Sequence, residues 1–171
     1  VKVILHESLS VWKLVNDELY IIDNQGHLFE YNPTDKESAR IQHTLFHEKQ
    51  TLIEKSIINL GLNANLNYTS VDIGGQLTRA DIVINFNDEH ANAVINGVYI
   101  AGQNQHIDNH ISANHYIGST QSSQNFYGVI GGNGRCVFNG KALVCEGAIG
   151  TNANQYNHNL LISENAEINT K

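Results

Sequence analysis

Three residues near the middle of the chain have the types and the spacing that could bind a metal ion. His106, Asp108 and His110 occupy alternate positions, and alternate side chains of a β-strand point to one face. Two imidazoles and a carboxylate are workable ligands for a divalent cation, and His115 could approach from the next turn of the chain. The alternative is that all four are polar residues on an outer face or in a turn, hydrogen-bonded to neighbouring segments. We favour this alternative, because the H-x-D-x-H spacing is not a specific signature.

The two cysteines and a second histidine pair are weaker candidates for chemistry. Cys136 and Cys145 lie in apolar runs where alternation turns one or both inward, and a buried cysteine behaves as a small hydrophobe. A reactive thiol needs access and a lowered pKa, so we predict that neither cysteine has a chemical role. His43 and His47 would share one face of a helix and could share a metal there, although no third ligand is nearby. The alternation around His43 fits a strand equally well.

Other catalytic patterns are missing from the sequence, and we expect no enzyme activity. Ser119, Ser122 and Ser123 form a polar run without the G-x-S-x-G elbow of a hydrolase, and no G-x-x-x-x-G-K phosphate loop is present. Carbohydrate-active enzymes built on a β-helix use clustered carboxylates along a groove. The carboxylates after residue 90 are few and scattered, although stacking of strands could still bring two together: Asp108, Glu146, Glu164 and Glu167.

Short strands must position these residues. From Gly61 onward, apolar alternation is broken by Gly and Asn about every 10 to 12 residues, which suits a sandwich, a barrel or a β-helix. Pro33 is the only proline, so no later residue lacks the backbone donor that sheet ladders need. The many Asn and Gln side chains suggest strands stacked in register, with like residues bonded above and below. We predict that the inward-facing residues include Ile82, Ile84, Val137, Leu143 and Leu161.

Composition narrows the class of protein further. Charged residues make up 16% of the chain, and the net charge of −7 argues against a nucleic-acid partner. No apolar run reaches membrane-spanning length, no signal peptide is visible, and two cysteines suit a reducing compartment. At the N-terminal end, residues 1–5 alternate like a strand, and residues 19–22 and 28–31 flank a turn-rich connector that predicts a hairpin.

One ordered set of residues resembles the core of a known family. The set is Gln105, Asp108, His115, Ser122, Gln124, Gly128, Arg135, Phe138, Gly140, Thr151, Ala153, Gln155, Asn157, Asn159, Leu160, Leu161, Ser163 and Ala166. It is similar to the SufB/SufD family of iron–sulfur cluster assembly proteins from about Gly61 to the end. Of the polar candidates above, Asp108 and His115 match the pattern, whereas His106 and His110 do not.

The resemblance implies a fold and a role. It implies an all-β, right-handed parallel β-helix, with strands rather than a helix over residues 38–60. It also implies a non-catalytic, cytoplasmic scaffold of the SUF system that pairs with SufB and SufC, or a homodimer of the intact protein. The SufB branch has a cysteine where this chain has Asn157, which favours the SufD branch. A β-helix carbohydrate-active enzyme and a purely structural solenoid are the alternatives.

The same resemblance sets expectations for cofactors and domains. We expect no cofactor in this stretch, because the family associates an iron–sulfur cluster, and a flavin, only with the whole complex. The family-pattern residues that we single out are Asp108, His115, Ser122, Gln124, Gln155 and Asn157. We expect residues 1–37 to form strands and a hairpin that lead into a β-helix core at 38–171, the whole being a fragment of a longer chain.

Overall fold

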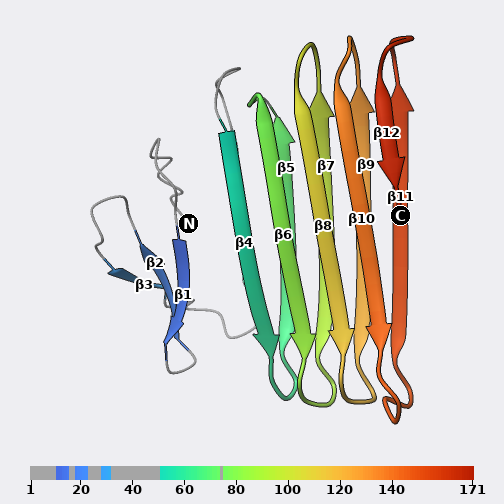
Figure 1. The fold of residues 1–171 in the computed structure, drawn as a ribbon. Helices are drawn as coiled ribbons and strands as arrows, with labels where there is room; N and C mark the ends of the chain where they lie inside the picture. The colour runs from blue at the N-terminus through green and yellow to red at the C-terminus, as the bar shows by residue number, and fades with distance from the viewer. Residues whose placement is uncertain (1–10, 16–17, 23–27, 32–50, 74) are drawn as a thin grey trace.

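The computed structural model describes residues 11–15, 18–22, 28–31, 51–73 and 75–171, and every regular element in these ranges is a β-strand (Figure 1). The first three strands form an antiparallel sheet in the order β1-β2-β3: β1 (Val11–Val15), β2 (Glu18–Ile22) and β3 (Leu28–Tyr31). The pairing of β2 with β3 confirms the predicted hairpin. The strand predicted over residues 1–5, His43, His47 and the boundary between residues 37 and 38 lie outside the described ranges.

Nine further strands wind into a solenoid of stacked coils. They are β4 (Thr51–Leu60), β5 (Asn65–Ile73), β6 (Leu77–Phe86), β7 (Asn92–Ala101), β8 (His106–His115), β9 (Gln121–Ile130), β10 (Arg135–Val144), β11 (Asn152–Leu161) and β12 (Glu167–Thr170). Successive strands alternate between two parallel sheets. The front sheet has the order β12-β10-β8-β6-β4, and the rear sheet has the order β11-β9-β7-β5.

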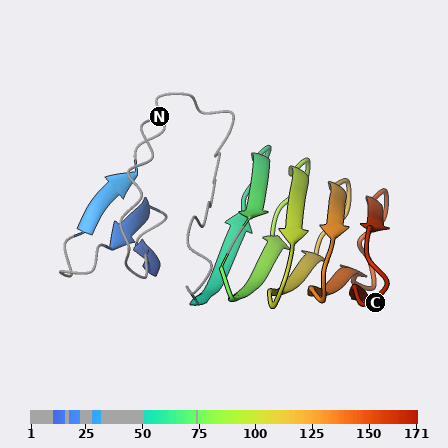
Figure 2. The same cartoon turned by 90° about the horizontal axis from the view of Figure 1, so that it is seen from above.

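The solenoid is right-handed. Front-sheet strands run downward in Figure 1, rear-sheet strands run upward behind them, and the chain advances from left to right with each coil (Figures 1 and 2). Backbone hydrogen bonds run between coils, as in the pairing of Leu77 with His106 and of His106 with Arg135. This architecture confirms the predicted parallel β-helix. The strand β4 also confirms that residues 51–60 are a strand rather than a helix.

Strict alternation separates the interior from the two outer faces. In β6 and β8 every second side chain is buried and its neighbours are partly exposed. Ile82 and Ile84 are inside, as predicted, together with the large rings of Phe86, Tyr99 and Phe126. Burying each such side chain contributes on the order of 1.5–3 kcal/mol, so the stacked interior rows supply most of the stability of the coils.

Asparagine ladders join the coils from outside. Asn114 Nδ2 donates to Asn85 Oδ1 at 3.0 Å, and Asn85 Nδ2 donates to Asn59 Oδ1 at 2.9 Å. A second ladder on the rear sheet joins Asn125 to Asn96, also at 3.0 Å. These bonds confirm the prediction that like amides pair above and below. They lie 26 or 29 residues apart in sequence because one coil takes that length of chain.

Two of the five predicted inward-facing residues, Val137 and Leu143, face outward instead, and Leu161 lies on the inward row but is not buried. Val137 lies on the outer face, because the inward row of β10 is that of Cys136 and Phe138; an error of one position in a strand exchanges the two faces. Leu143 makes the same error, because it pairs with Asn114 on the outward row of β8, and it is 37% exposed. Leu161 pairs with the buried Ile130 and is nevertheless 44% exposed. Leu161 is exposed because β11 is the terminal strand of the rear sheet in the described part of the chain, so no further strand is stacked over it.

Candidate functional site

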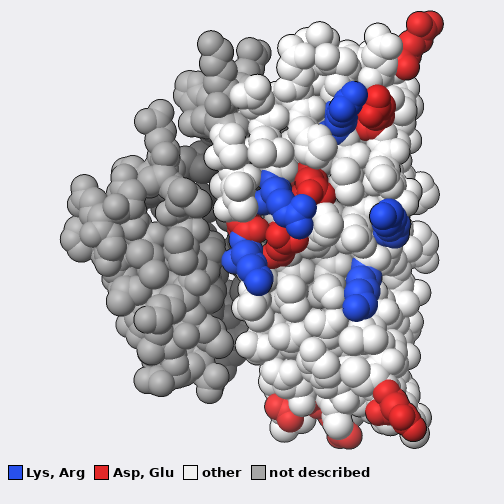
Figure 3. All heavy atoms as spheres, viewed as in Figure 1, with Lys and Arg blue, Asp and Glu red and all other residues white. Residues whose placement is uncertain are grey.

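The three residues that alternate on β8 point outward together, as the sequence predicts, but an arginine joins them. His110 Nε2 lies 2.7 Å from Asp108 Oδ1, and Arg79 on the neighbouring strand β6 forms an ion pair with Asp108. The Arg79 guanidinium also pairs with Asp81 Oδ1 at 2.9 Å. Figure 3 shows Lys and Arg side chains beside Asp and Glu side chains on the face of the front sheet. The Asp108 carboxylate is therefore held by a guanidinium and an imidazole.

The structure does not bring the four metal candidates together. His115 ends β8 on the inward row, on the opposite face from His106, Asp108 and His110. Within the described ranges, no three His, Cys, Asp or Glu side chains are grouped so that they could hold a metal ion. On the outward face, Asp108 is held by His110 of its own strand and by Arg79 of the neighbouring strand.

His115 is the centre of a polar group inside the solenoid. Its ring is fully buried and stacks on Phe86, with 4.1 Å between ring centroids and an interplanar angle of 14°. Nδ1 lies 2.8 Å from Thr120 Oγ1, and Nε2 lies 2.9 Å from Ser122 Oγ. Burial lowers the pKa of His115, so the imidazole is neutral near pH 7. A neutral ring donates one hydrogen bond and accepts one, and the two hydroxyls provide for both.

Three further family-pattern residues lie on the inward rows of the rear sheet. Gln124 is fully buried, and its Nε2 donates to the carbonyl of Lys141 at 3.1 Å. Asn157 Nδ2 donates to Tyr99 Oη at 3.0 Å. Gln155 is exposed but passes directly over Gly140, where an added Cβ would lie 2.5 Å from its Nε2. These side chains bridge the two sheets or successive coils, and they are oriented toward protein atoms.

A buried acidic group near the first coils was not predicted. Glu54 and Asp72 are both less than a tenth exposed. Ser56 Oγ donates to Glu54 Oε1 at 2.7 Å, and Asn109 Nδ2 donates to Asp72 Oδ2 at 3.3 Å. Burial raises the pKa of the nearby Tyr68 phenol, and the charges of Glu54 and Asp72 raise it further. Alternation along the strands could have predicted that Glu54 and Asp72 are buried, because both occupy inward-facing positions of their strands.

The cysteines occupy different environments. Cys136 is buried on the inward row of β10, and burial raises the pKa of its thiol to about 12. Cys145 follows β10 and is only partly buried, so one of the two cysteines, Cys136, is enclosed. Neither forms a disulfide. A protonated thiol in an apolar interior is a poor nucleophile and a poor metal ligand.

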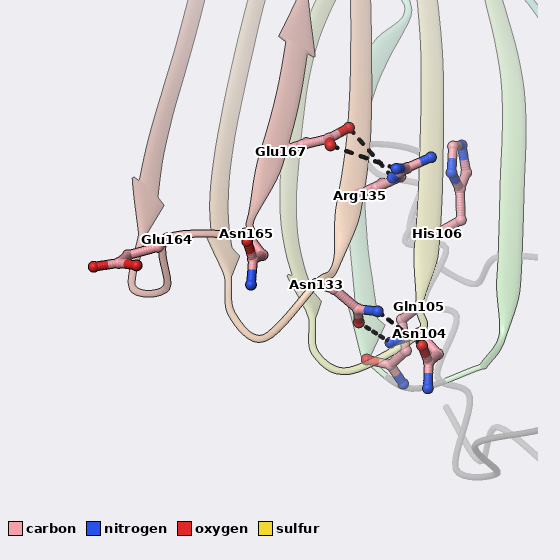
Figure 4. Close-up of a pocket in the computed structure, with 8 residues that line it drawn as sticks. All are labelled: Asn104, Gln105, His106, Asn133, Arg135, Glu164, Asn165 and Glu167. Carbon is pink, nitrogen blue, oxygen red and sulfur yellow. Dashed lines mark hydrogen bonds and ion pairs between the residues drawn. The ribbon is translucent and has the colours of Figure 1, made fainter.

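An open hollow lies where the front-sheet strands begin (Figure 4). It is lined by Asn104, Gln105, His106, Asn133, Arg135, Glu164, Asn165 and Glu167. Arg135 Nε pairs with Glu167 Oε2 at 3.2 Å, and Asn133 Nδ2 donates to Asn104 Oδ1 at 2.8 Å. Two pairs of lining residues therefore bond to each other along the stacking direction. No helix of the described chain is long and apolar enough to cross a membrane.

Comparison with known proteins gives one family. A family model described as SUF system FeS cluster assembly, SufBD core domain, matches residues 34–171. The chain is 31% identical over 99 residues to the iron-sulfur cluster assembly protein SufD of Escherichia coli (strain K12), which covers 58% of this chain and 23% of that protein. It is also 31% identical over 121 residues to the iron-sulfur cluster assembly SufBD family protein slr0076 of Synechocystis sp., covering 70% of this chain and 26% of that protein. The chain thus spans about a quarter of the length of these two relatives.

Proposed function

Because the chain belongs to the SufBD core domain family of the SUF iron–sulfur cluster assembly system, we propose that it acts there as a non-catalytic scaffold subunit. A role in SUF assembly follows from the family match over residues 34–171. The finer proposal is that the chain pairs, through its β-helix, with SufB and SufC subunits in the cytoplasm, and that the SufD branch is its place in the family. The relative named SufD supports that branch.

The scaffold role is supported by the polar residues inside the solenoid, which bond to other groups of the protein. His115, Ser122 and Gln124 match the family pattern, and all three are buried and hydrogen-bonded to protein groups. A catalytic acid, base or nucleophile must reach a substrate, whereas these side chains join one strand or coil to another. Their arrangement supports a rigid coil stack that presents surfaces to partners.

We propose that the iron–sulfur cluster is cargo of the whole assembly and is not held by this chain alone. Cys136 is enclosed and its thiol pKa is about 12, which leaves Cys145 as one accessible sulfur ligand. Iron–sulfur clusters are held by several thiolates together. Anaerobic incubation of the purified chain with iron and sulfide should therefore give no stable visible absorption band. A band that disappears in Cys136→Ser or Cys145→Ser would contradict this proposal.

Co-purification tests the pairing proposal. The tagged protein, expressed together with SufB and SufC from the same organism, should retain both subunits through affinity and size-exclusion steps. The matched control is the same tag on an unrelated β-helix protein of similar charge. The scaffold proposal would be wrong if the protein retained neither subunit and released new reducing ends from a polysaccharide. That result would favour the carbohydrate-active enzyme instead.

A further inference from the structure

The turns that lead from front-sheet strands to rear-sheet strands lie together at the lower end of the solenoid in Figure 1. We call them the lower edge, which comprises residues 61–64, 87–91, 116–120 and 145–151. Backbone hydrogen bonds join each turn to the next. Asn63 N donates to Glu89 O at 3.2 Å, His90 N donates to Ser119 O at 3.1 Å, and Ser119 N donates to Ile149 O at 2.8 Å. The lower edge is therefore one continuous surface.

Large apolar side chains are exposed on the lower edge. Leu62 is 64% exposed and Ile149 is 83% exposed, and Tyr116 and Ile117 are exposed in the turn between β8 and β9. The turns at the opposite end, which we call the upper edge, cover residues 75–76, 102–105, 131–134 and 162–166. Among the described residues of the upper edge, Ile162 is the single large apolar side chain that is exposed. Exposed apolar groups gathered in this way mark an interaction site.

The charged side chains of the lower edge are acidic. Asp88, Glu89 and Glu146 are exposed, and the four turns contain no Lys or Arg. Within the part of the chain that the structure describes, the basic group paired with these acids is His90, whose Nε2 lies 4.0 Å from Glu89 Oε2. In Figure 3 the lower end of the face in view has acidic and no basic side chains. The lower edge thus combines apolar surface with a local excess of negative charge.

We propose that the lower edge binds a basic, amphipathic segment of another protein, in which Lys or Arg residues lie beside large apolar residues. The apolar side chains favour an occupant that removes them from water, and the acids select an occupant of positive charge. The same acids repel nucleic acid and anionic membranes, which carry phosphate groups. A second copy of this chain, with its net charge of −7, is disfavoured for the same reason.

The length of the lower edge sets the size of the bound segment. Three steps of ~4.8 Å separate its first turn from its fourth, so the edge is ~14 Å long. An α-helix rises ~1.5 Å per residue, and about ten residues span that distance. Residues three or four apart share one face of a helix, so a helix with apolar residues at this spacing could contact Ile117 and Ile149 together. The contact is smaller than a standard protein interface, and we expect micromolar or weaker affinity.

This inference does not rest on the proposed function. The family-pattern residues Asp108, His115, Ser122, Gln124, Gln155 and Asn157 all lie in strands, outside the four turns of the lower edge. Binding of a basic segment can be measured without SufB or SufC. Failure of co-purification and failure of this binding are therefore separate outcomes.

Fluorescence anisotropy with a labelled Leu–Lys peptide of about 14 residues, whose leucines share one helical face, tests the proposal. The same peptide with Glu at each Lys position is the control. Matched variants alter exposed residues on the two edges: Glu146→Gln and Ile149→Ser on the lower edge, and Glu164→Gln and Ile162→Ser on the upper edge. We expect Glu146→Gln to weaken binding by about threefold and Ile149→Ser by about fivefold or more, and the upper-edge variants to change it by about twofold or less. Circular dichroism verifies that each variant keeps its strands.

Three results would overturn the proposal. The first is an equal effect of the variants on the two edges, because the peptide would then be attracted by the overall charge of the chain. The second is a Leu–Glu peptide that binds as tightly as the Leu–Lys peptide. The third is a Leu–Lys peptide that does not bind at hundreds of micromolar protein in low salt. Added salt should weaken the binding by screening and leave the effect of Ile149→Ser in place.

Discussion

His115 shows how a titratable side chain is accommodated inside this solenoid. The ring is fully buried between Phe86 and two hydroxyls, and its neutral form makes both hydrogen bonds without leaving a charge in the interior. Protonation would turn both nitrogens into donors and would desolvate a positive charge. The stability of the coil stack is therefore linked to the protonation state of this residue.

The pH dependence of unfolding tests that linkage. The pKa of His115 in the folded chain is below its unfolded value of about 6.5, so below pH 6.5 the unfolded state binds more protons. Stability is fully present above that pH and falls as the pH drops toward the folded pKa, by up to ~1.4 kcal/mol per pH unit. Urea unfolding of the wild type and His115→Gln between pH 5 and 8 should show a shallower slope in the variant. Equal slopes would contradict the assignment.

The two cysteines provide a second test at the level of single residues. Burial raises the pKa of Cys136 to about 12, whereas Cys145 is partly exposed. At pH 8 we expect a maleimide to modify Cys145 quickly and Cys136 at least ~100-fold more slowly, because the thiolate is the reacting form. Peptide mass spectrometry of timed samples measures both rates, and unfolding in urea should make them similar. Rapid labelling of Cys136 in the folded chain would show that the interior is open there.

At the level of the strands, glycine and aromatic residues fit together between coils of the rear sheet. Gly97 lies in register with Phe126, and a Cβ on Gly97 would lie 2.0 Å from Phe126 Cε1. The Phe126 ring packs in turn on Phe138 of the front sheet, with 4.9 Å between centroids. The absence of a side chain at Gly97 therefore leaves the space that this inter-sheet ring pair requires.

Gly97→Ala should consequently overpack the interior. We expect a loss of ~1–3 kcal/mol in the free energy of unfolding, because the Phe126 ring is enclosed and cannot move aside without displacing Phe138. Gly61→Ala is the matched control, since its nearest neighbour is an Asp88 oxygen at 3.7 Å, an ordinary contact. Chemical denaturation measures both variants. If Gly61→Ala lowered the free energy of unfolding as much as Gly97→Ala does, backbone entropy rather than packing would account for the effect.

The whole solenoid is held by nearest-neighbour contacts between coils. The strands of the front sheet pair in the order β12-β10-β8-β6-β4, so β6, β8 and β10 have a strand on each side and β12 has one partner. Stability in such arrays is close to a sum of coil and interface terms. Local opening should accordingly cost most free energy in the central coils and least at β12.

Hydrogen exchange followed by mass spectrometry should display this gradient. We expect amides of β7 and β8 to exchange most slowly in the solenoid and amides of β12 most rapidly, with β11 between them. The reason is that β7 and β8 are paired on both edges, whereas β12 contributes four paired residues. Exchange at one common rate throughout the solenoid would instead indicate a single cooperative unit.

Several features of this protein are contained in its sequence. Alternation and Gly or Asn breakers predicted the short strands, and the abundance of Asn predicted ladders such as Asn59, Asn85 and Asn114. The low fraction of charged residues, the single proline and the family resemblance predicted a parallel β-helix. These features are local or compositional, because strand period, turn residues and backbone donors act within a few positions along the chain.

Only the tertiary structure decided which face is inside and which side chains meet. Alternation gives a strand two faces without saying which is buried, so Val137 was assigned to the wrong face, and the buried Glu54 and Asp72 were missed. Arg79 reaches Asp108 because one coil returns the chain to the same place after 29 residues. Coil length and strand register depend on the complete stack of coils. A short segment of the sequence does not contain both residues of a contact between coils.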